Sequence, residues 1–181
     1  MKLYNNGLII GRFQSFHKGH EFIIRQGLKL CKQVYVYIGS SQEAGTKVNP
    51  FSYGEREAML KAVFKKEIAT KKLIIKPLPD MGLGNNVQWG LYVLNHVKED
   101  FNVEIDLYIT GCEKERSSWF TNEIAPHMDE LRLTRRNITI CATDCREALL
   151  NDEYEKWCSF VPKKLYNFYE ELRTIIKEVN E

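Results

Sequence analysis

Short apolar runs alternate along the chain with longer stretches that carry apolar residues at helical spacing, and this alternation limits the possible folds. The clearest run, Val34–Ile38, is β-branched and aromatic on both faces, which is typical of a buried strand in a parallel sheet. Strands that alternate with helices predict a doubly wound parallel sheet with helices on both faces. We therefore expect an α/β fold.

The runs also give approximate bounds for the elements. We predict five strands, at Leu8–Ile10, Val34–Ile38, Lys72–Ile75, Ile105–Ile109 and Asn137–Cys141. We predict helices over about 21–32, after a capping box at Ser52 and Glu55, over about 87–97, and through Trp119 and Ile124. Residues from about 147 to 181 are predicted to be a C-terminal helical extension of one domain that spans 1–181, with Pro162 near the start of the final helix.

Composition excludes several classes of protein. The 181 residues are 44% hydrophobic and 28% charged, as in soluble globular proteins. The 26 Lys and Arg nearly balance the 24 Asp and Glu, so we expect no nucleic-acid partner. No apolar run approaches the roughly 18 residues of a membrane span, and residues 1–7 lack the apolar part of a secretion signal. We expect no membrane partner and a cytoplasmic location, where the five irregularly spaced cysteines stay reduced.

The carboxyl ends of parallel strands meet at one edge of a sheet, so the loops after the predicted strands should form one site. The first of these loops runs from Gly11 to His20, and it contains His17 and His20 three residues apart, on one face of a helical turn. With Arg12 and Lys18 beside a helix N-terminus, the loop predicts a site for a polyphosphate. Zinc is the alternative ligand for paired histidines, but no third ligand lies nearby, so we predict no protein-bound metal.

The same loop, Gly11-Arg12-Phe13-Gln14-Ser15-Phe16-His17-Lys18-Gly19-His20, resembles the GRFQPFHxGH signature of archaeal-type nicotinamide mononucleotide (NMN) adenylyltransferases. That family belongs to the HxGH nucleotidyltransferase superfamily. Ser15 departs from its usual proline, which removes some rigidity from the loop and no catalytic group. The resemblance covers about residues 8–170 and implies a Rossmann-like fold of about five strands.

Two further segments carry the resemblance on the acceptor side. Residues 39–56 are similar to the family's GSAQ…NPFTxGER segment, and Asn86 and Trp89 match its N-x-x-W element. The resemblance implies that Trp89 stacks on the nicotinamide ring and that Asn86 helps to recognise the carboxamide. From the residues alone, the alternative is that Trp89 is a core residue of an amphipathic helix. The predicted NMN-binding residues are Arg12, Ser40, Arg56, Asn86 and Trp89.

The ATP side rests on the loops after the fourth and fifth predicted strands. Gly111 and Glu113 stand where related enzymes contact adenosine, and residues 142–146 resemble the family's second signature, SxTxxR. We predict Thr143 as the N-cap of a helix and Arg146 as a bidentate phosphate ligand. The predicted ATP-binding residues are Gly11, Phe13, His17, Lys18, Gly19, His20, Gly111, Glu113, Thr143 and Arg146, and of these His17, His20 and Arg146 are predicted to be catalytic.

The implied reaction joins the AMP of ATP to NMN and releases pyrophosphate, with Mg²⁺ bridging the phosphates of ATP. A phosphate monoester is already ionised at neutral pH, so the nucleophile needs no general base. Two alternatives stay open: another acceptor, such as nicotinate mononucleotide or a different phosphorylated small molecule, and a non-catalytic nucleotide-sensing domain. The oligomeric state is also open, since many members of the family self-associate.

Overall fold

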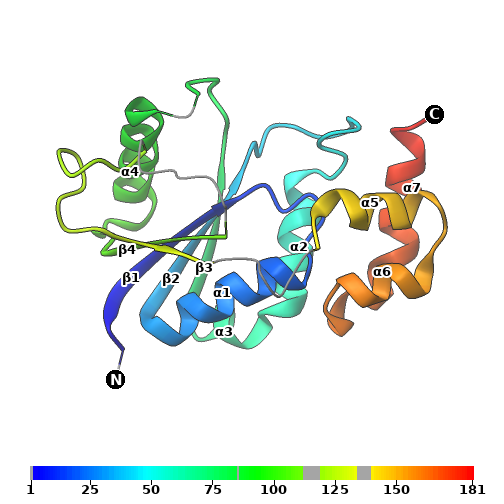
Figure 1. Ribbon diagram of the computed structural model, residues 1–181, viewed down its shortest axis with the longest axis horizontal. Coiled ribbons are helices and arrows are strands. Elements are labelled where there is room, and N and C mark those ends of the chain that lie inside the picture. The colour runs from blue at the N-terminus through cyan, green and yellow to red at the C-terminus, as the bar shows by residue number, and fades with distance from the viewer. Residues whose placement is uncertain (1, 85, 112–118, 134–139) are drawn as a thin grey trace.

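The computed structural model describes residues 2–84, 86–111, 119–133 and 140–181 (Figure 1). The described residues form a five-stranded, wholly parallel sheet in the order β3-β2-β1-β4-β5. Its strands are β1 (Tyr4–Gly11), β2 (Cys31–Gly39), β3 (Leu73–Leu78), β4 (Leu107–Thr110) and β5 (Asp129–Arg132). The prediction of a doubly wound α/β fold is confirmed.

Helices lie on both faces of this sheet, and Figure 1 shows α4 on the side opposite to α1 and α3. The helices that follow the first three strands are α1 (Lys18–Leu30), α2 (Tyr53–Val63), α3 (Lys65–Ala69) and α4 (Val87–Phe101). The capping box predicted for α2 is confirmed, because Ser52 accepts from the Glu55 N–H and the Glu55 carboxylate accepts from the Ser52 N–H. No helix among the described residues is both long enough and apolar enough to cross a membrane.

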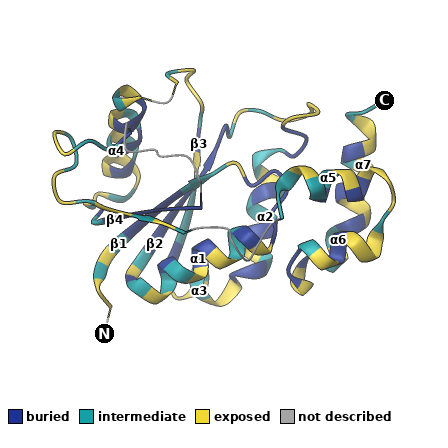
Figure 2. Cartoon of the chain, viewed as in Figure 1, coloured by how far each residue is buried: buried dark blue, intermediate teal, exposed yellow. Residues whose placement is uncertain are grey.

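Neighbouring residues of each central strand supply two separate cores. In β1, Ile9 joins a cluster beneath α1 and α2, whereas Leu8 joins a cluster beneath α4. Leu8 pairs with Tyr35 of β2 in the sheet, and both belong to the α4 cluster. The buried residues in Figure 2 accordingly follow the sheet and the inner faces of the helices. The central strands are therefore covered on both faces, which explains their continuous apolar sequences.

The C-terminal residues pack beside the first core. They form α5 (Ala142–Leu150), α6 (Tyr154–Phe160), the 3-10 helix η1 (Lys163–Phe168) and α7 (Tyr169–Glu178). Trp157, Leu165 and Leu172 are fully buried and belong to the same cluster as Ile9. The prediction of one final helix after Pro162 is wrong in detail, because η1 precedes α7.

Two further predictions need correction. The fifth described strand is Asp129–Arg132, whereas residues 137–139 of the predicted Asn137–Cys141 strand lie outside the described residues and Ile140 and Cys141 are not in a strand. The described strand has three charged residues in four, which suits a sheet edge and hides the apolar signal of a strand. The helix predicted through Trp119 and Ile124 is a series of turns, such as Ala125 N–H to Thr121 C=O at 2.9 Å, followed by Pro126, which has no N–H to donate.

Candidate active site

Two cavities meet at the carboxyl end of β1. The first has a volume of about 250 Å³ and the second of about 680 Å³. Ile10, Gly11 and Arg12 line both of them. Residues that follow β1, β2 and β4 line one or both cavities, as the prediction of a shared site at this edge requires.

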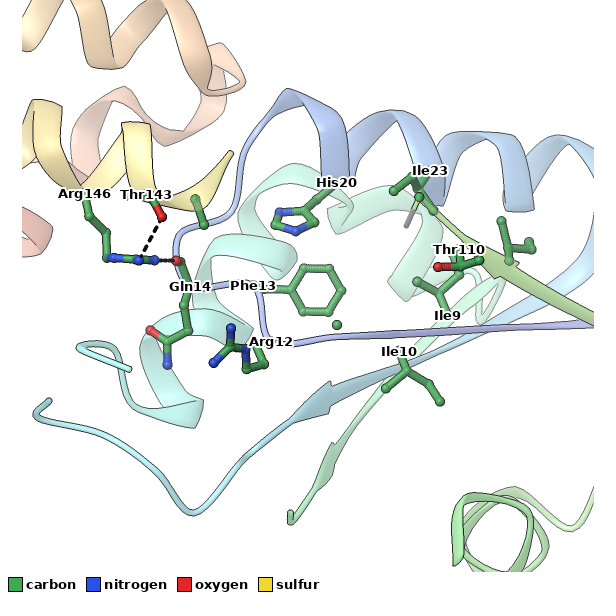
Figure 3. Close-up of a pocket in the computed structure, with 14 residues that line it drawn as sticks. Ile9, Ile10, Arg12, Phe13, Gln14, His20, Ile23, Thr110, Thr143 and Arg146 are labelled. Atoms are coloured by element: carbon green, nitrogen blue, oxygen red, sulfur yellow. Dashed lines mark hydrogen bonds between the residues drawn. The ribbon is translucent and has the colours of Figure 1, made fainter. Parts of the chain in front are cut away.

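The first cavity lies between the loop after β1, the start of α1, the end of β4 and the start of α5 (Figure 3). His20 lines it from α1, and Thr143 and Arg146 line it from α5. The His20 ring packs edge-on against Phe13, with ring centroids 4.8 Å apart. Phe13 is buried behind Gly11, where an added Cβ would lie only 3.0 Å from the Phe13 ring. The glycine therefore lets the backbone and this ring approach closely.

The two histidines are stacked, as their spacing predicts. Their ring centroids are 3.8 Å apart, with an angle of 27° between the ring planes. His17 is buried and caps α1, because its Nδ1 accepts from the N–H of Gly19 at 3.1 Å. A neutral His17 would therefore carry its proton on Nε2. His20 lines the cavity, and His17 lies behind it.

Positive charge is concentrated where the two cavities meet. Neither Arg12 nor Arg146 forms an ion pair with any residue in the described ranges. Partial burial, together with the nearby Arg12 guanidinium, lowers the pKa of Arg146. Arg146 also donates to the main-chain oxygen of Gln14 and to Thr143 Oγ1, the latter at 3.3 Å. Two neighbouring guanidinium groups with no acidic partner among the described residues form a site that favours an anion.

The second cavity has an aromatic wall and a polar wall. Trp89 and Trp119 supply the aromatic wall, with ring centroids 5.9 Å apart and a 70° angle between the rings. Ser40, Glu43, Asn49 and Asp80 supply polar side chains. Trp89 is only 8% exposed, and its side chain still borders the second cavity.

Arg56 was predicted to contact NMN, but the structure places it in the protein interior. Its side chain is fully buried, and its guanidinium donates to the carbonyls of Gly39 at 2.8 Å, Arg12 at 3.0 Å and Ser40 at 3.1 Å. Burial lowers the pKa of Arg56, and Arg12 acts in the same direction. The guanidinium is thus surrounded by main chain and does not line the second cavity. It fixes two loops that do, and the prediction of a direct NMN contact is revised accordingly.

Two other predicted site residues, Asn86 and Lys18, have different partners from those expected. Asn86 is the N-cap of α4, with its Oδ1 accepting from the N–H groups of Gln88 and Trp89 and its Nδ2 donating to Leu83 C=O. Lys18 donates from Nζ to Ser159 C=O at 2.6 Å, which directs it toward α6. Neither side chain lines either cavity.

The helix cap at α5 also differs from its prediction, since Cys141 is the N-cap and Thr143 lies within the first turn. Asp144 accepts from the Cys141 N–H at 2.9 Å, and this bond lowers the pKa of its carboxyl. Glu113, predicted to contact ATP, lies outside the described residues. Gly111 does line the first cavity.

No cluster of three or more His, Cys, Asp or Glu side chains in the described parts of the chain could hold a metal ion. The described lining of the first cavity contains no carboxylate. A divalent cation in this cavity would therefore rely on the oxygens of its ligand.

Comparison with known proteins gives the family. Residues 8–78 match the cytidylyltransferase-like family model. Over 170 residues the chain is 31% identical to a nicotinamide-nucleotide adenylyltransferase of Saccharolobus solfataricus, a match that covers 93% of this chain and 92% of the relative. The chain belongs to the nicotinamide-nucleotide adenylyltransferase family. A second such enzyme, from Thermococcus kodakarensis, is 29% identical over 96% of this chain and 86% of its own length.

Solved structures show that the fold of this adenylyltransferase family also occurs in enzymes named for a different acceptor. A bifunctional NMN adenylyltransferase/ADP ribose pyrophosphatase from Francisella tularensis matches with a TM-score of 0.71 at 24% identity. That match covers 97% of this chain and 52% of the Francisella chain, so this chain spans about half of that protein. A nicotinic acid mononucleotide adenylyltransferase from Plasmodium falciparum matches with a TM-score of 0.61 at 12% identity, over 98% of this chain and all of the other. The fold alone therefore does not distinguish the amide from the acid.

Gln14 is a site residue of this adenylyltransferase chain that sequence reasoning missed. Its side chain exchanges two hydrogen bonds with the Phe51 main chain, Nε2 to C=O at 2.8 Å and N–H to Oε1 at 2.9 Å. Its own carbonyl accepts from Arg146. Gln14 thus joins the loop before α2 to the start of α5. The position of Gln14 inside the first signature indicated that it lies near the site, but a glutamine side chain does not by itself indicate its hydrogen-bond partners.

Proposed function

We propose that this chain transfers the adenylyl group of ATP to NMN, giving NAD and pyrophosphate. The observation that carries this proposal is the pair of cavities that meet at Arg12. A reaction that joins two phosphate-bearing molecules needs both phosphates at one point. The shared wall offers that point, with positive charge and with space on either side for the rest of each molecule.

The chemistry requires positioning more than proton transfer. An oxygen of the NMN phosphate attacks the α-phosphorus of ATP, and the bond from that phosphorus to the bridging oxygen of the β-phosphate breaks. The attacking phosphate is already ionised near neutral pH, so no base has to remove a proton. Orientation of the two reactants alone supplies on the order of 7–11 kcal/mol of rate enhancement.

The residues of the first cavity, which bind ATP in this proposal, stabilise the negative charge that develops on the transferring group and on pyrophosphate. In this proposal His20 and Arg146 contact phosphate oxygens of ATP, Thr143 adds a hydroxyl, and His17 orients His20 through the stacked rings. Mg²⁺ enters with ATP, since phosphate oxygens and water are its preferred ligands and the described cavity lining supplies no carboxylate.

The residues that line the second cavity bind NMN in this proposal. Arg12 binds its phosphate at the shared wall, Ser40 borders the path of the ribose, and Trp89 contacts the pyridine ring. Arg56 and Asn86 do not contact NMN in this proposal. Arg56 positions the loop that carries Ser40, and Asn86 caps the helix that carries Trp89.

Pyrophosphate release by the purified protein tests this assignment directly. With ATP and Mg²⁺ we expect release only when an acceptor is added, and NAD should form in equal amount when that acceptor is NMN. Parallel reactions with nicotinate mononucleotide and with no acceptor serve as comparisons. ATP binding without turnover on either mononucleotide would contradict the proposal and favour a sensing domain.

Trp89→Leu tests the proposed ring contact on the NMN side. Stacking on an aromatic ring contributes roughly 0.5–1.5 kcal/mol beyond burial, so loss of the ring should raise the KM for NMN about 2- to 12-fold. The KM for ATP should stay unchanged, because Trp89 does not line the first cavity. Tyr92→Phe on the same helix is the control, since it removes only the hydroxyl that donates to Pro79 C=O. An unchanged KM for NMN in Trp89→Leu would rule out ring contact.

A further inference from the structure

Asp80 places a carboxylate in the acceptor cavity, away from the arginine that receives the phosphate. Asp80 follows β3 and Arg12 follows β1, and β2 lies between these strands. Two strand spacings separate them, which is about 10 Å. The acceptor's phosphate has to lie at the Arg12 wall, because only there does the second cavity meet the first. The opposite end of the acceptor, its ring, therefore lies toward Asp80 and Trp89.

Hydrogen bonds hold the Asp80 carboxylate in place, and no cation of the described residues neutralises it. Its Oδ1 accepts from the Gly82 N–H at 2.9 Å, and its Oδ2 accepts from Ser40 Oγ at 3.4 Å. Gln42 fixes the main chain of the same residue, donating to its C=O at 2.8 Å and accepting from its N–H at 3.0 Å. No Lys, Arg or His of the described residues forms an ion pair with Asp80.

Glu43, the other carboxylate of the second cavity, lies close to an arginine. Glu43 bonds the Asn49 side chain, which also accepts from Arg12 at 3.4 Å. Arg56 lies close enough to Glu43 for the carboxylate to act on the pKa of the guanidinium. Glu43 thus lies near the Arg56 charge, whereas no cationic side chain among the described residues pairs with Asp80.

The pyridine ring of a mononucleotide carries a positive charge on its ring nitrogen. A fixed carboxylate and the face of an indole both favour a cationic ring. The two natural forms differ in the ring substituent, which is a neutral amide in NMN and an anionic carboxylate in nicotinate mononucleotide. The amide N–H groups are donors that a carboxylate accepts, whereas a second carboxylate is repelled.

We propose that Asp80 is a specificity-determining residue, whose fixed carboxylate makes the acceptor cavity select the amide mononucleotide over the acid. This inference rests on the proposed function and concerns only the choice between two acceptors. The general fold does not make that choice, since it occurs in enzymes named for either mononucleotide.

Asp80→Asn tests the inference with a change of charge and almost none of shape. The asparagine Oδ1 retains the contact to the Gly82 N–H, and the exposed position tolerates the substitution. We expect kcat/KM to rise for nicotinate mononucleotide and to fall for NMN, so that their ratio changes about 10-fold. A structural defect would lower both values together. Glu99→Gln, which removes an exposed charge on α4, should leave the ratio unchanged.

A second measurement needs no variant. Raising the salt concentration screens the Asp80 carboxylate, so the preference of the wild-type enzyme for NMN should decrease and Asp80→Asn should lack this decrease. A ratio within twofold of wild type in Asp80→Asn, or a parallel loss with both acceptors, would overturn the role of Asp80. Absence of product from either acceptor in the wild-type protein would instead contradict the proposed function.

Discussion

His20→Ala is expected to lower kcat for NAD formation about 10²- to 10³-fold, which is the usual cost of removing one group that stabilises developing charge. His20 lines the first cavity, and its ring is held between His17 and Phe13, with centroid distances of 3.8 Å and 4.8 Å. The ring is therefore placed before ATP binds, and its loss removes a preorganised contact to phosphate. The KM for NMN should change little, because His20 does not line the second cavity.

Steady-state pyrophosphate release at saturating ATP and NMN measures this effect. His127→Ala is a matched control, since that histidine is exposed and lines neither the first nor the second cavity. His20→Asn keeps an N–H donor and should recover part of the lost rate. Turnover of His20→Ala within a few-fold of wild type would show that the histidine pair does not act on the transferring phosphate.

Arg56→Met is expected to destabilise the fold by about 3–5 kcal/mol, the cost of breaking a buried charged network by removing one member. Its guanidinium satisfies the carbonyls of Gly39, Ser40 and Arg12, which lie in the loops after β2 and β1. Methionine fills much of the same space but donates no hydrogen bond, so these carbonyls lose their donor. At roughly 2–4 °C per kcal/mol for a domain of this size, the melting temperature should fall by about 10 °C.

Thermal unfolding followed by circular dichroism measures the shift. Lys61→Met on the same helix is the control, because Lys61 is exposed and its pair with Glu57 contributes at most about 0.5 kcal/mol. Arg56→Lys keeps the charge but lacks the planar fork, so it should recover only part of the loss. A melting temperature of Arg56→Met equal to that of the control would mean that these loops hold their shape without the arginine.

The fold was predictable where burial on both faces leaves a strong apolar signal. Val34–Ile38 is such a run, and it lies at the centre of β2. The edge strand Asp129–Arg132 was missed because its stability comes from pairing with β4, which a charged four-residue sequence does not reveal. Pairing with a distant strand is a tertiary property, and no local pattern encodes it.

At the site, the signatures predicted which residues gather but not always what their side chains do. The spacing of His17 and His20 predicted that they share one face of a helical turn, and the structure adds that their rings are stacked. Asn86 was interpreted as a ligand residue, yet an asparagine just before a helix serves equally well as an N-cap, which is the role that the structure shows. The burial of Arg56 depends on loops from two strands that close around it, and helix position alone could not indicate that enclosure.

Because the two cavities are lined by largely different segments, the residues of one can change in evolution without changing those of the other. The first cavity is formed by the β1 loop, the start of α1, the end of β4 and α5, whereas the second takes most of its side chains from the segments after β2 and β3. Only the end of β1 belongs to both. Under the proposed function, substitutions and insertions in residues 40–49 and 80–84 would change the accepted molecule and leave the residues proposed for adenylyl transfer unchanged. A chain built in this way can acquire a new acceptor through surface loops, which tolerate change far better than the sheet beneath them.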